Sequence, residues 1–425
     1  MTEKEKAKSE VLPGGGLVGT QQLFGKSYIW KWIIRVAWSY RRTFFYLLRK
    51  KGVKAAFNFL YVKVFVPTGE GSAGAIYFLI GWLIRRFPGL APHPNYIEME
   101  MTTICNKRCI ICEHTYWKPK DQEYRHLTFK EFKTYIDQFP KLKWVNLTGE
   151  GSAFLNPEYV KMLKYLKQKK VPIFLVDHLA DMDKKTIEEL VKMGIDGIYI
   201  SIDGATKATY EKVKKGCDFD KVVGNLKYLV EMKKKYKSPI PELCFRFVIT
   251  TENYKEIPDL VDLVFSIGNK KELGDGTRID YCGLLSFKEI DYLKVGKIPK
   301  PIIARLVEKQ KQYDALVLFA HVEAIGAENA PVESCISWME PYIMMGGYVQ
   351  PCCAVMMSNN RPWLREHAFG NLNEKSFKEI WHSDRYKRFR ASINNSKKQV
   401  PLYCAGCRAF STKERVKKYG IAKDL

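Results

Sequence analysis

Three cysteines lie close together at Cys105, Cys109 and Cys112, with the spacing C-x3-C-x2-C. They follow an alternating apolar run over 97–101, which predicts a strand, so they belong to the loop that leaves its carboxyl end. Three thiolates on one short loop can bind three irons of a cubane cluster, which leaves the fourth iron open for a substrate or cofactor. A zinc site is the alternative, because His114 could supply a fourth ligand.

A second group of cysteines lies near the end of the chain, among short segments separated by turn residues. Its members are Cys335, Cys352, Cys353, Cys404 and Cys407. The pattern indicates a small carboxyl-terminal domain stapled by a metal cluster, with a structural zinc site as the alternative. The other cysteines, Cys217, Cys244 and Cys282, match no cluster motif and are expected as free thiols.

Two further loops carry residues suited to a small polar ligand. The first follows the second expected strand, and its glycines allow the backbone to approach a ligand closely. The candidate ligand-binding residues of this loop are Gly149, Glu150, Gly151 and Ser152. At the end of the fourth expected strand, Ser201 and Asp203 are suited to bind ribose hydroxyls. The alternatives are a tight turn for the first loop and a helix-capping role for Asp203.

Strands and helices alternate from about residue 95 to 290. The expected strands are Tyr96–Thr102, Trp144–Thr148, Pro172–Asp177, Gly197–Asp203, Leu243–Thr250 and Arg278–Leu285. Such strand–helix repeats predict parallel strands with outer helices. Six repeats are fewer than a closed eightfold barrel needs, so we expect an α/β fold with a partial (β/α)6 TIM-like barrel. In such folds the chemistry lies at the carboxyl ends of the strands, where the cysteine loop is placed.

Capping residues predict several helix boundaries. Thr128 and Glu131 have the spacing of a capping box. Asn156 is followed by a proline, which predicts a helix that starts there. Gly194 and Gly268 are predicted to end helices.

The segment over 27–94 is rich in aromatic and basic residues, and between Lys26 and Ile97 its only acid is Glu70. A helical wheel gives a basic stripe of Lys31, Arg35, Arg42 and Arg49, roughly opposite the apolar residues Ile33, Ala37, Tyr40, Phe44 and Leu48. This pattern is typical of an amphipathic helix lying in the interface of an anionic membrane. A second apolar run over 73–84 is too short to span a bilayer. The alternative is a helical extension that packs on the following domain.

Composition limits the compartment and the partners. The 425-residue chain has 11 cysteines, eight of them in the two groups, and shows no secretory signal, which favours reduced thiolates in the cytoplasm. The net charge of +24 predicts attraction to anions, and we expect a peripheral position at the inner face of the cell membrane. No nucleic-acid-binding module is recognisable, so no nucleic-acid partner is expected.

The cysteine loop and its position after a first strand resemble the radical S-adenosylmethionine (SAM) superfamily. The loop at 148–157 is similar to the family's Gly-Gly-Glu-Pro-type motif, whose main chain holds the amino group of SAM, although the aligned Glu and Pro are absent. The run over 201–220 resembles the family's fourth strand and following helix. The order of the later cysteines resembles the SPASM extension, which follows the barrel in many peptide-modifying members.

The resemblance implies two clusters. Cys105, Cys109 and Cys112 would hold a [4Fe-4S] cluster whose open iron chelates SAM. The ligands of one auxiliary [4Fe-4S] cluster would be Cys335, Cys352 or Cys353, Cys404 and Cys407. The extra cysteines of two-cluster members are missing. Reductive cleavage of SAM would give a 5′-deoxyadenosyl radical for hydrogen abstraction, with an electron donor such as ferredoxin or flavodoxin.

These interpretations divide the chain into four parts. They are a disordered tail over 1–26, an interfacial helical region over 27–94, a radical SAM core over 95–325 and a SPASM-like domain over 326–415. The resemblance implies a radical SAM oxidoreductase that modifies a peptide or protein, a maturase. An alternative is radical modification of a lipid or lipid-linked substrate at the membrane surface. A third hypothesis, from another class, is a non-catalytic metal-binding membrane adaptor.

Overall fold

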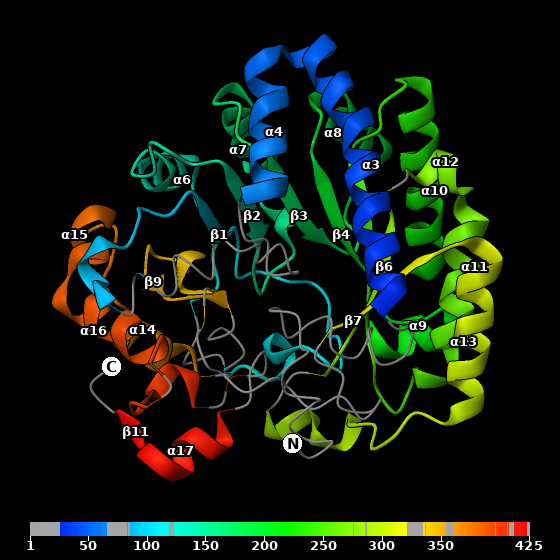
Figure 1. The fold of residues 1–425 in the computed structure, drawn as a ribbon. Coiled ribbons are helices and arrows are strands. Elements are labelled where there is room, and N and C mark those ends of the chain that lie inside the picture. Colours follow the sequence, from blue (N-terminus) through cyan, green and yellow to red (C-terminus); the bar gives the residue numbers. More distant parts are fainter. Residues whose placement is uncertain are drawn as a thin grey trace.

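One sheet organises the molecule (Figure 1). The computed structural model describes residues 26–422 apart from 66–82, 84–85, 119–122, 275, 285–286, 321–334, 336, 354–359, 396, 406 and 408–411. The sheet contains β1 (Tyr96–Glu100), β2 (Trp144–Thr148), β3 (Ile173–Asp177), β4 (Gly197–Ser201), β5 (Glu242–Val248), β6 (Arg278–Cys282) and β7 (Leu316–Ala320). Each of these strands pairs in parallel with the next, so their carboxyl ends lie along one edge.

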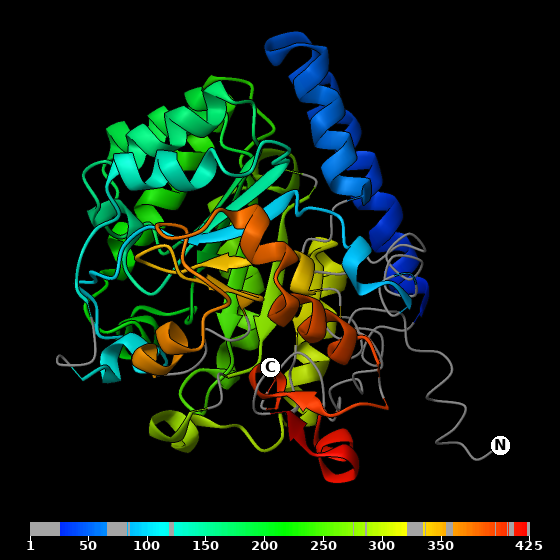
Figure 2. The same ribbon diagram turned by 90° about the vertical axis from the view of Figure 1, so that its left-hand side faces the viewer.

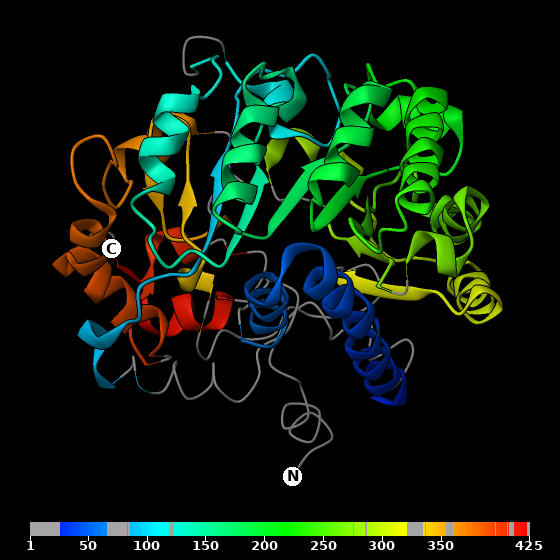
Figure 3. The same cartoon turned by 90° about the horizontal axis from the view of Figure 1, so that it is seen from above.

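Helices connect these strands and lie mainly on one face of the sheet (Figure 3). They are α6 (Phe129–Ile136), α7 (Tyr159–Gln168), α8 (Lys184–Met193), α9 (Lys207–Val213), α10 (Phe219–Lys235), α11 (Ile257–Ile267), α12 (Lys270–Leu273) and α13 (Lys300–Tyr313). In the described part of the chain β7 and β9, at the two ends of the sheet, do not pair, so the barrel is open. The expected α/β fold with a partial barrel is confirmed.

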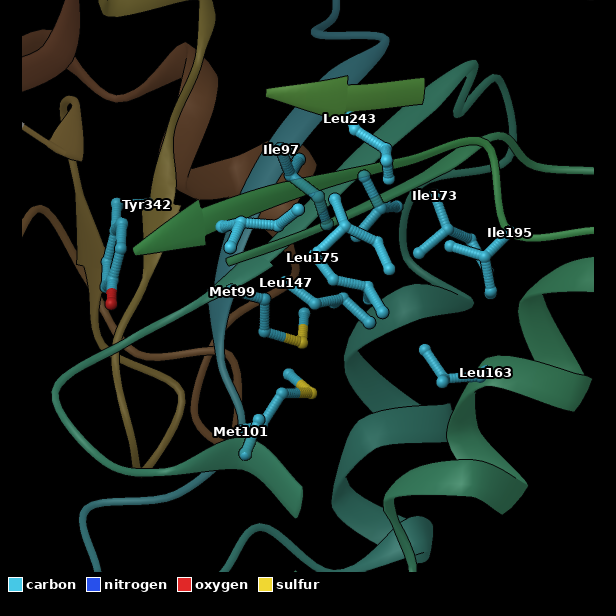
Figure 4. Packing of buried hydrophobic residues seen from close by; sticks show 14 of the residues in the cluster. Ile97, Met99, Met101, Leu147, Leu163, Ile173, Leu175, Ile195, Leu243 and Tyr342 are labelled. Atoms are coloured by element: carbon cyan, nitrogen blue, oxygen red, sulfur yellow. The ribbon is translucent and has the colours of Figure 1, made fainter. Parts of the chain in front are cut away.

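The main core lies between the sheet and these helices. Ile97 and Met99 of β1, Leu147 of β2 and Ile173 and Leu175 of β3 are fully buried there and pack together (Figure 4). They occupy alternate positions because successive side chains of a strand point to opposite faces. The same strands therefore present a second set of side chains to the concave side.

An aromatic row fills part of the concave side. Tyr96, Trp144, Phe174 and Tyr199 follow one another across β1 to β4, with ring centroids 6.4, 4.3 and 5.2 Å apart. A Cβ added to Gly197 would lie 2.2 Å from the Phe174 ring, so this ring fits only because residue 197 lacks a side chain. The row is an apolar support beneath the polar strand ends.

The predicted strands all occur, and four of them end two residues or more before the predicted limit; β1, for example, ends at Glu100. Strand β7 was not predicted. Its sequence, Leu-Val-Leu-Phe-Ala, is apolar without alternation, and periodicity alone does not distinguish such a run from a buried helix.

Most of the predicted caps are confirmed. Thr128 and Glu131 form the reciprocal capping box of α6, α8 ends at Gly194 in the left-handed conformation, and α11 ends at Gly268. The helix start at Asn156 is wrong, because α7 begins three residues later. Asn156 instead donates from Nδ2 to the carbonyls of residues 101 and 127, at 3.0 and 2.9 Å, and thereby ties two loops together.

The carboxyl-terminal segment extends the same sheet. Strand β8 (Tyr342–Ile343) pairs in parallel with β1, and β9 (Val349–Gln350) pairs antiparallel with β8. The segment continues with α14 (Arg361–Glu366), α15 (Phe377–His382), α16 (Asp384–Ile393), β10 (Val400–Pro401), α17 (Lys413–Tyr419) and β11 (Ile421–Ala422). These elements lie together beyond the β1 edge of the sheet (Figures 1 and 2).

A helical hairpin precedes the sheet. It consists of α3 (Lys26–Lys51) and α4 (Val53–Phe65), which run antiparallel beside the sheet (Figure 1). Among the described helices, none combines the length and the apolar character that crossing a bilayer requires. The expected tail over 1–26 and the apolar run over 73–84 lie outside the described residues, apart from Lys26 and Leu83.

The hairpin packs on the loop before β5 through one apolar face. Leu47, Ala56 and Phe59 are buried with Ile240, which lies in the loop before β5. Three residues of the expected lipid-facing side, Tyr40, Phe44 and Leu48, pack at the edge of this cluster. That part of the expectation is therefore corrected: much of the predicted apolar face packs within the protein.

Candidate functional site

The cysteine loop leaves the carboxyl end of β1 and is held from two sides. Ile110 N donates to Val213 O at 3.0 Å, which attaches the loop to the end of α9. Ser152 N donates to Ile104 O at 2.9 Å, which attaches it to the glycine loop after β2. Parallel pairing of β1 with β2 brings these loops to the same edge of the sheet.

The three thiols of the loop are buried or partly buried. Burial raises the pKa of Cys105, Cys109 and Cys112. Cys105 raises the pKa of Cys109 further, and Cys109 does the same to Cys112. Metal ligation requires thiolates, and a bound metal supplies the positive charge that stabilises them. The donor set therefore fits a cluster bound through three irons.

His114 is not placed as a fourth ligand beside these thiols. Its Nε2 lies 2.9 Å from Thr103 O, inside the protein. The described residues do form one group of possible metal donors within 4.8 Å of one another, and it consists of Cys112, Glu113 and Glu150. The geometry thus does not favour the zinc alternative that relied on His114.

The glycines of the second loop lie against β1. Gly149 has a φ of +144°, and a Cβ there would lie 2.8 Å from Glu100 Cγ. A Cβ on Gly151 would lie 2.5 Å from Thr102 O. Close packing of the two strand ends explains both glycines, and their contact with SAM stays a prediction.

The two polar candidates of this loop have different surroundings. Burial beside Glu113 raises the pKa of Glu150 well above its usual range. Ser152 Oγ donates to Asp181 Oδ2 at 2.6 Å. Asp181 Oδ1 also accepts from Lys107 Nζ of the cysteine loop, at 2.9 Å. Ser152 is therefore part of the support of that loop.

Ser201 and Asp203, the candidates at the end of β4, both contact the same lysine. Lys214 Nζ lies 2.9 Å from Asp203 Oδ2 and donates to Ser201 Oγ at 2.6 Å. Asp203 is fully buried, and its Oδ1 accepts from Val248 N at 2.7 Å. The helix-capping alternative is wrong, because Thr206 caps α9. Both candidates already have partners within the chain, and their contact with ribose stays a prediction.

Sequence reasoning missed two buried lysines beside the thiols. Burial opposes the charge of Lys214, but Asp203 and then Cys109 raise its pKa above the usual value. Lys107 forms an ion pair with Asp181, and each of the two side chains is 8% exposed. For Lys107, the only sequence signal of a role beside the thiols was its position between two cysteines. Lys214 gave no such signal, because it lies in a lysine-rich run typical of a solvated surface.

Four thiols of the carboxyl-terminal segment form a second group. They are Cys335, Cys352, Cys404 and Cys407. Burial raises the pKa of Cys404 well above its usual range, and the other three thiols raise it further. Four such thiols are the donor set of a fully ligated cubane cluster or of a structural zinc ion.

Cys353 faces the barrel instead. Burial and then the neighbouring Glu98 raise the pKa of its thiol well above the usual range. Glu98 Oε1 also accepts from Tyr96 Oη at 3.0 Å and from Asn146 Nδ2 at 2.8 Å. Cys352 raises the pKa of Cys404, whereas Cys353 lies beside Glu98, so the assignment of Cys352 rather than Cys353 to the second thiol group is our prediction.

Comparisons with known proteins agree with this geometry. The family model of the radical SAM superfamily matches residues 99–264. The model of the SPASM iron–sulfur cluster-binding domain matches residues 335–408. Both matches include the cysteines of the corresponding thiol group, and neither includes the helical hairpin.

Two curated relatives and one solved structure cover most of the chain. The tungsten-containing aldehyde ferredoxin oxidoreductase cofactor-modifying protein of Pyrococcus furiosus is 24% identical over 71% of this chain and 84% of its own length. The AdoMet-dependent heme synthase of Methanosarcina barkeri is 22% identical over 74% and 91%. The SAM-bound structure of Streptococcus suis SuiB is 15% identical, covers 90% of this chain and 91% of its own, and has a TM-score of 0.58, a likeness of fold.

Proposed function

The chain belongs to the radical SAM superfamily and carries a SPASM iron–sulfur domain, and from this premise we propose that the enzyme modifies a peptide or protein substrate. The supporting observation is that both thiol groups are attached to one sheet: the first lies on the loop after β1, and the second lies on the carboxyl-terminal segment that adds β8 and β9 to this sheet. The same fold occurs in SuiB, whose structures include one bound to the precursor peptide SuiA. Membership of an enzyme superfamily sets aside the non-catalytic adaptor.

In this proposal Cys105, Cys109 and Cys112 hold a [4Fe-4S] cluster, and the glycine loop binds SAM at the open iron. When bound and reduced, the cluster would supply one electron to SAM, whose cleavage gives methionine and the 5′-deoxyadenosyl radical for hydrogen abstraction. The chain's own part is to keep the cysteine loop in place, through the Lys107–Asp181 ion pair and the backbone bond between Ser152 and Ile104.

We assign one auxiliary [4Fe-4S] cluster to Cys335, Cys352, Cys404 and Cys407. Four thiols saturate one cubane, so this cluster has no open iron and is suited to electron transfer rather than to SAM binding. The electron donor is proposed to be a ferredoxin or flavodoxin. The net charge of +24 would attract such a partner if its surface is acidic.

Iron analysis tests the cluster assignment. Anaerobically reconstituted protein should contain about eight irons, four for each cubane. The triple replacement of Cys105, Cys109 and Cys112 by Ala should halve the iron and abolish 5′-deoxyadenosine formation. Normal SAM cleavage by this variant would overturn the assignment.

Isotope transfer tests the substrate class. Cells that lack the enzyme would be grown in deuterated medium, and their extract would be separated into peptide, lipid and small-molecule fractions. Each fraction is then incubated with enzyme, reductant and unlabelled SAM. Because hydrogen abstraction moves substrate deuterium into 5′-deoxyadenosine, we expect deuterated product with the peptide fraction. Label transfer from the lipid fraction alone would favour the lipid alternative instead.

A second proposal is that the hairpin binds an anionic membrane surface. Its outer side exposes a stripe of α3 formed by Ile34, Trp38 and Phe45, which are 66%, 61% and 47% exposed. Arg41 lies over the Trp38 ring at 4.1 Å. Apolar side chains with adjacent basic residues are typical of interfacial helices. This stripe, rather than the packed Tyr40 side, is the proposed lipid contact.

Vesicle binding tests that second proposal. The double variant Trp38→Ser/Phe45→Ser should bind vesicles of phosphatidylserine and phosphatidylcholine more weakly than the wild type, with unchanged thermal stability. Tyr292→Ser, which removes another exposed aromatic residue far from the hairpin in sequence, is the matched control. Equal binding by all three proteins would leave the hairpin as a packing element only.

A further inference from the structure

A buried ion pair joins the carboxyl-terminal segment to the first strand. Glu100, the last residue of β1, accepts from Arg361 Nη1 at 3.0 Å and Nη2 at 2.7 Å. The two side chains are 0% and 3% exposed. Met345 N donates to the same carboxylate at 2.7 Å. Two parallel bonds between a guanidinium and a carboxylate fix the direction of both groups, so the contact defines how the two regions meet.

Arg361 also faces the surroundings of the cysteine loop. Its guanidinium lies 5.0 Å from the centre of the Trp117 ring, five residues beyond Cys112. Although burial opposes its charge, Glu100 and then Glu150 raise the pKa of Arg361. Glu150 is one of the donor residues that lie within 4.8 Å of the Cys112 thiol. The first residue of α14 therefore brings a permanent positive charge to an acidic wall beside this thiol.

We propose that Arg361 is a positioning residue through which the SPASM domain sets the electrostatic potential at the SAM-binding cluster. The inference rests on the proposed [4Fe-4S] site at the cysteine loop. Without Arg361, the buried Glu100 loses the positive charge that is paired with it, next to the group that Glu150 forms with Cys112. Negative charge near a cluster opposes the addition of an electron, so the domain that carries the second cluster also favours reduction of the first.

The test is a redox titration of the wild type and four variants, followed by the electron paramagnetic resonance signal of the SAM-binding cluster. Arg361→Met should shift the midpoint potential to more negative values. Arg361→Lys, which keeps the charge, should lie near the wild type. Adding Glu100→Gln to Arg361→Met should move the potential back. Arg385→Met is the matched control, because Arg385 is bound to carbonyls of residues 367 and 368 within the same domain.

The outcomes separate this inference from the proposed function. A wild-type potential in folded Arg361→Met protein would overturn the role of Arg361 while leaving the cluster assignment intact. Loss of the assignment itself would appear as unchanged iron in the triple cysteine variant. Should Arg361→Met not fold, Glu100→Gln alone decides the question. It leaves the positive charge in excess and should shift the potential to more positive values, and an unchanged potential would refute the inference.

Discussion

Two buried lysines beside the cysteine loop are each paired with a carboxylate. Lys107 pairs with Asp181, and Lys214 pairs with Asp203. An unpaired charge is costly in a low-dielectric environment. Removal of one member of such a pair therefore strongly destabilises the folded protein. The Lys107–Asp181 pair also connects the loops that follow β1 and β3, so the position of the thiols depends on more than one segment.

The adjacent cysteines at 352 and 353 allow a matched comparison. Cys352→Ser should remove the auxiliary cluster, because this thiol lies in the group around Cys404. Cys353→Ser should keep it, because that thiol lies beside Glu98 of β1. Iron content and the electron paramagnetic resonance of the reduced protein measure both effects. The reverse pattern would exchange the two roles.

Because the pKa of the buried Asp177 is raised, we expect the stability of the protein to depend on pH. Burial raises its pKa from 3.8 to about 7. Between these values the folded state holds a proton that the unfolded state releases, so the free energy of unfolding falls as the pH rises from about 4 to 7. A tenfold difference in proton affinity between the two states corresponds to about 1.4 kcal/mol. Asp177→Asn should keep the acceptor for Leu179 N and remove this fall.

Melting of the metal-free protein between pH 5 and 8 measures the effect of Asp177→Asn. The variant should gain stability relative to the wild type as the pH rises. A difference between the two proteins that stays constant over this range would contradict the raised pKa.

The residues visible from sequence are those whose chemistry depends on local spacing. Cys105, Cys109 and Cys112 are separated by a few positions on one loop, and their type alone indicates metal binding. Arg361 and Glu100 are 261 positions apart, and no local pattern connects them. Their pairing follows from the sheet, which places β8 beside β1.

At the scale of elements, the loops after β1 and β2 pack so closely that adding one methyl group at residue 151 should destabilise the protein. In Gly151→Ala the new Cβ would lie 2.5 Å from Thr102 O and 2.7 Å from Ile104 O, both backbone atoms. We expect a loss of about 1–3 kcal/mol, as for other overpacked sites, together with weaker SAM binding. Chemical denaturation and SAM titration measure the two effects.

Gly224 is the control for this substitution. It lies on the exposed side of α10, and a Cβ there meets nothing within 4 Å. Gly224→Ala should therefore stabilise the protein by about 0.5–1 kcal/mol, because alanine is the better helix former. Equal effects of the two substitutions would show that the loop contact does not constrain residue 151.

Elements with a regular pattern were predictable, and those defined by their neighbours were not. The alternating residues of β1 and the capping box at Thr128 carry their own signal. Strands β8 and β9 have two residues each, which is too short for any periodicity. They exist because the edge of β1 offers hydrogen-bonding groups to a passing segment. The domain boundaries near 94 and 325 stay predictions.

At the scale of the whole molecule, one sheet carries three parts of the chain. Its carboxyl edge carries the cysteine loop, its β1 side carries the SPASM segment, and the loops before β4 and β5 carry the hairpin. The Lys51 ammonium donates to Met193 O at 2.9 Å, just before β4. The hairpin thus contacts the rim opposite the cysteine loop. Its loss should affect stability more than cluster binding.

Removal of residues 1–85 tests this separation. The truncated protein should retain both clusters, because the loops that carry the thiols make their described contacts elsewhere. It should melt at a lower temperature, since Ile240 is fully buried in the hairpin contact and exposing such a side chain costs about 1.5–3 kcal/mol. Ile240→Thr should lower the melting temperature of the full-length protein, in which the hairpin buries residue 240, more than that of the truncated protein. An unchanged melting temperature after truncation would mean that the hairpin contributes nothing to the stability of the barrel.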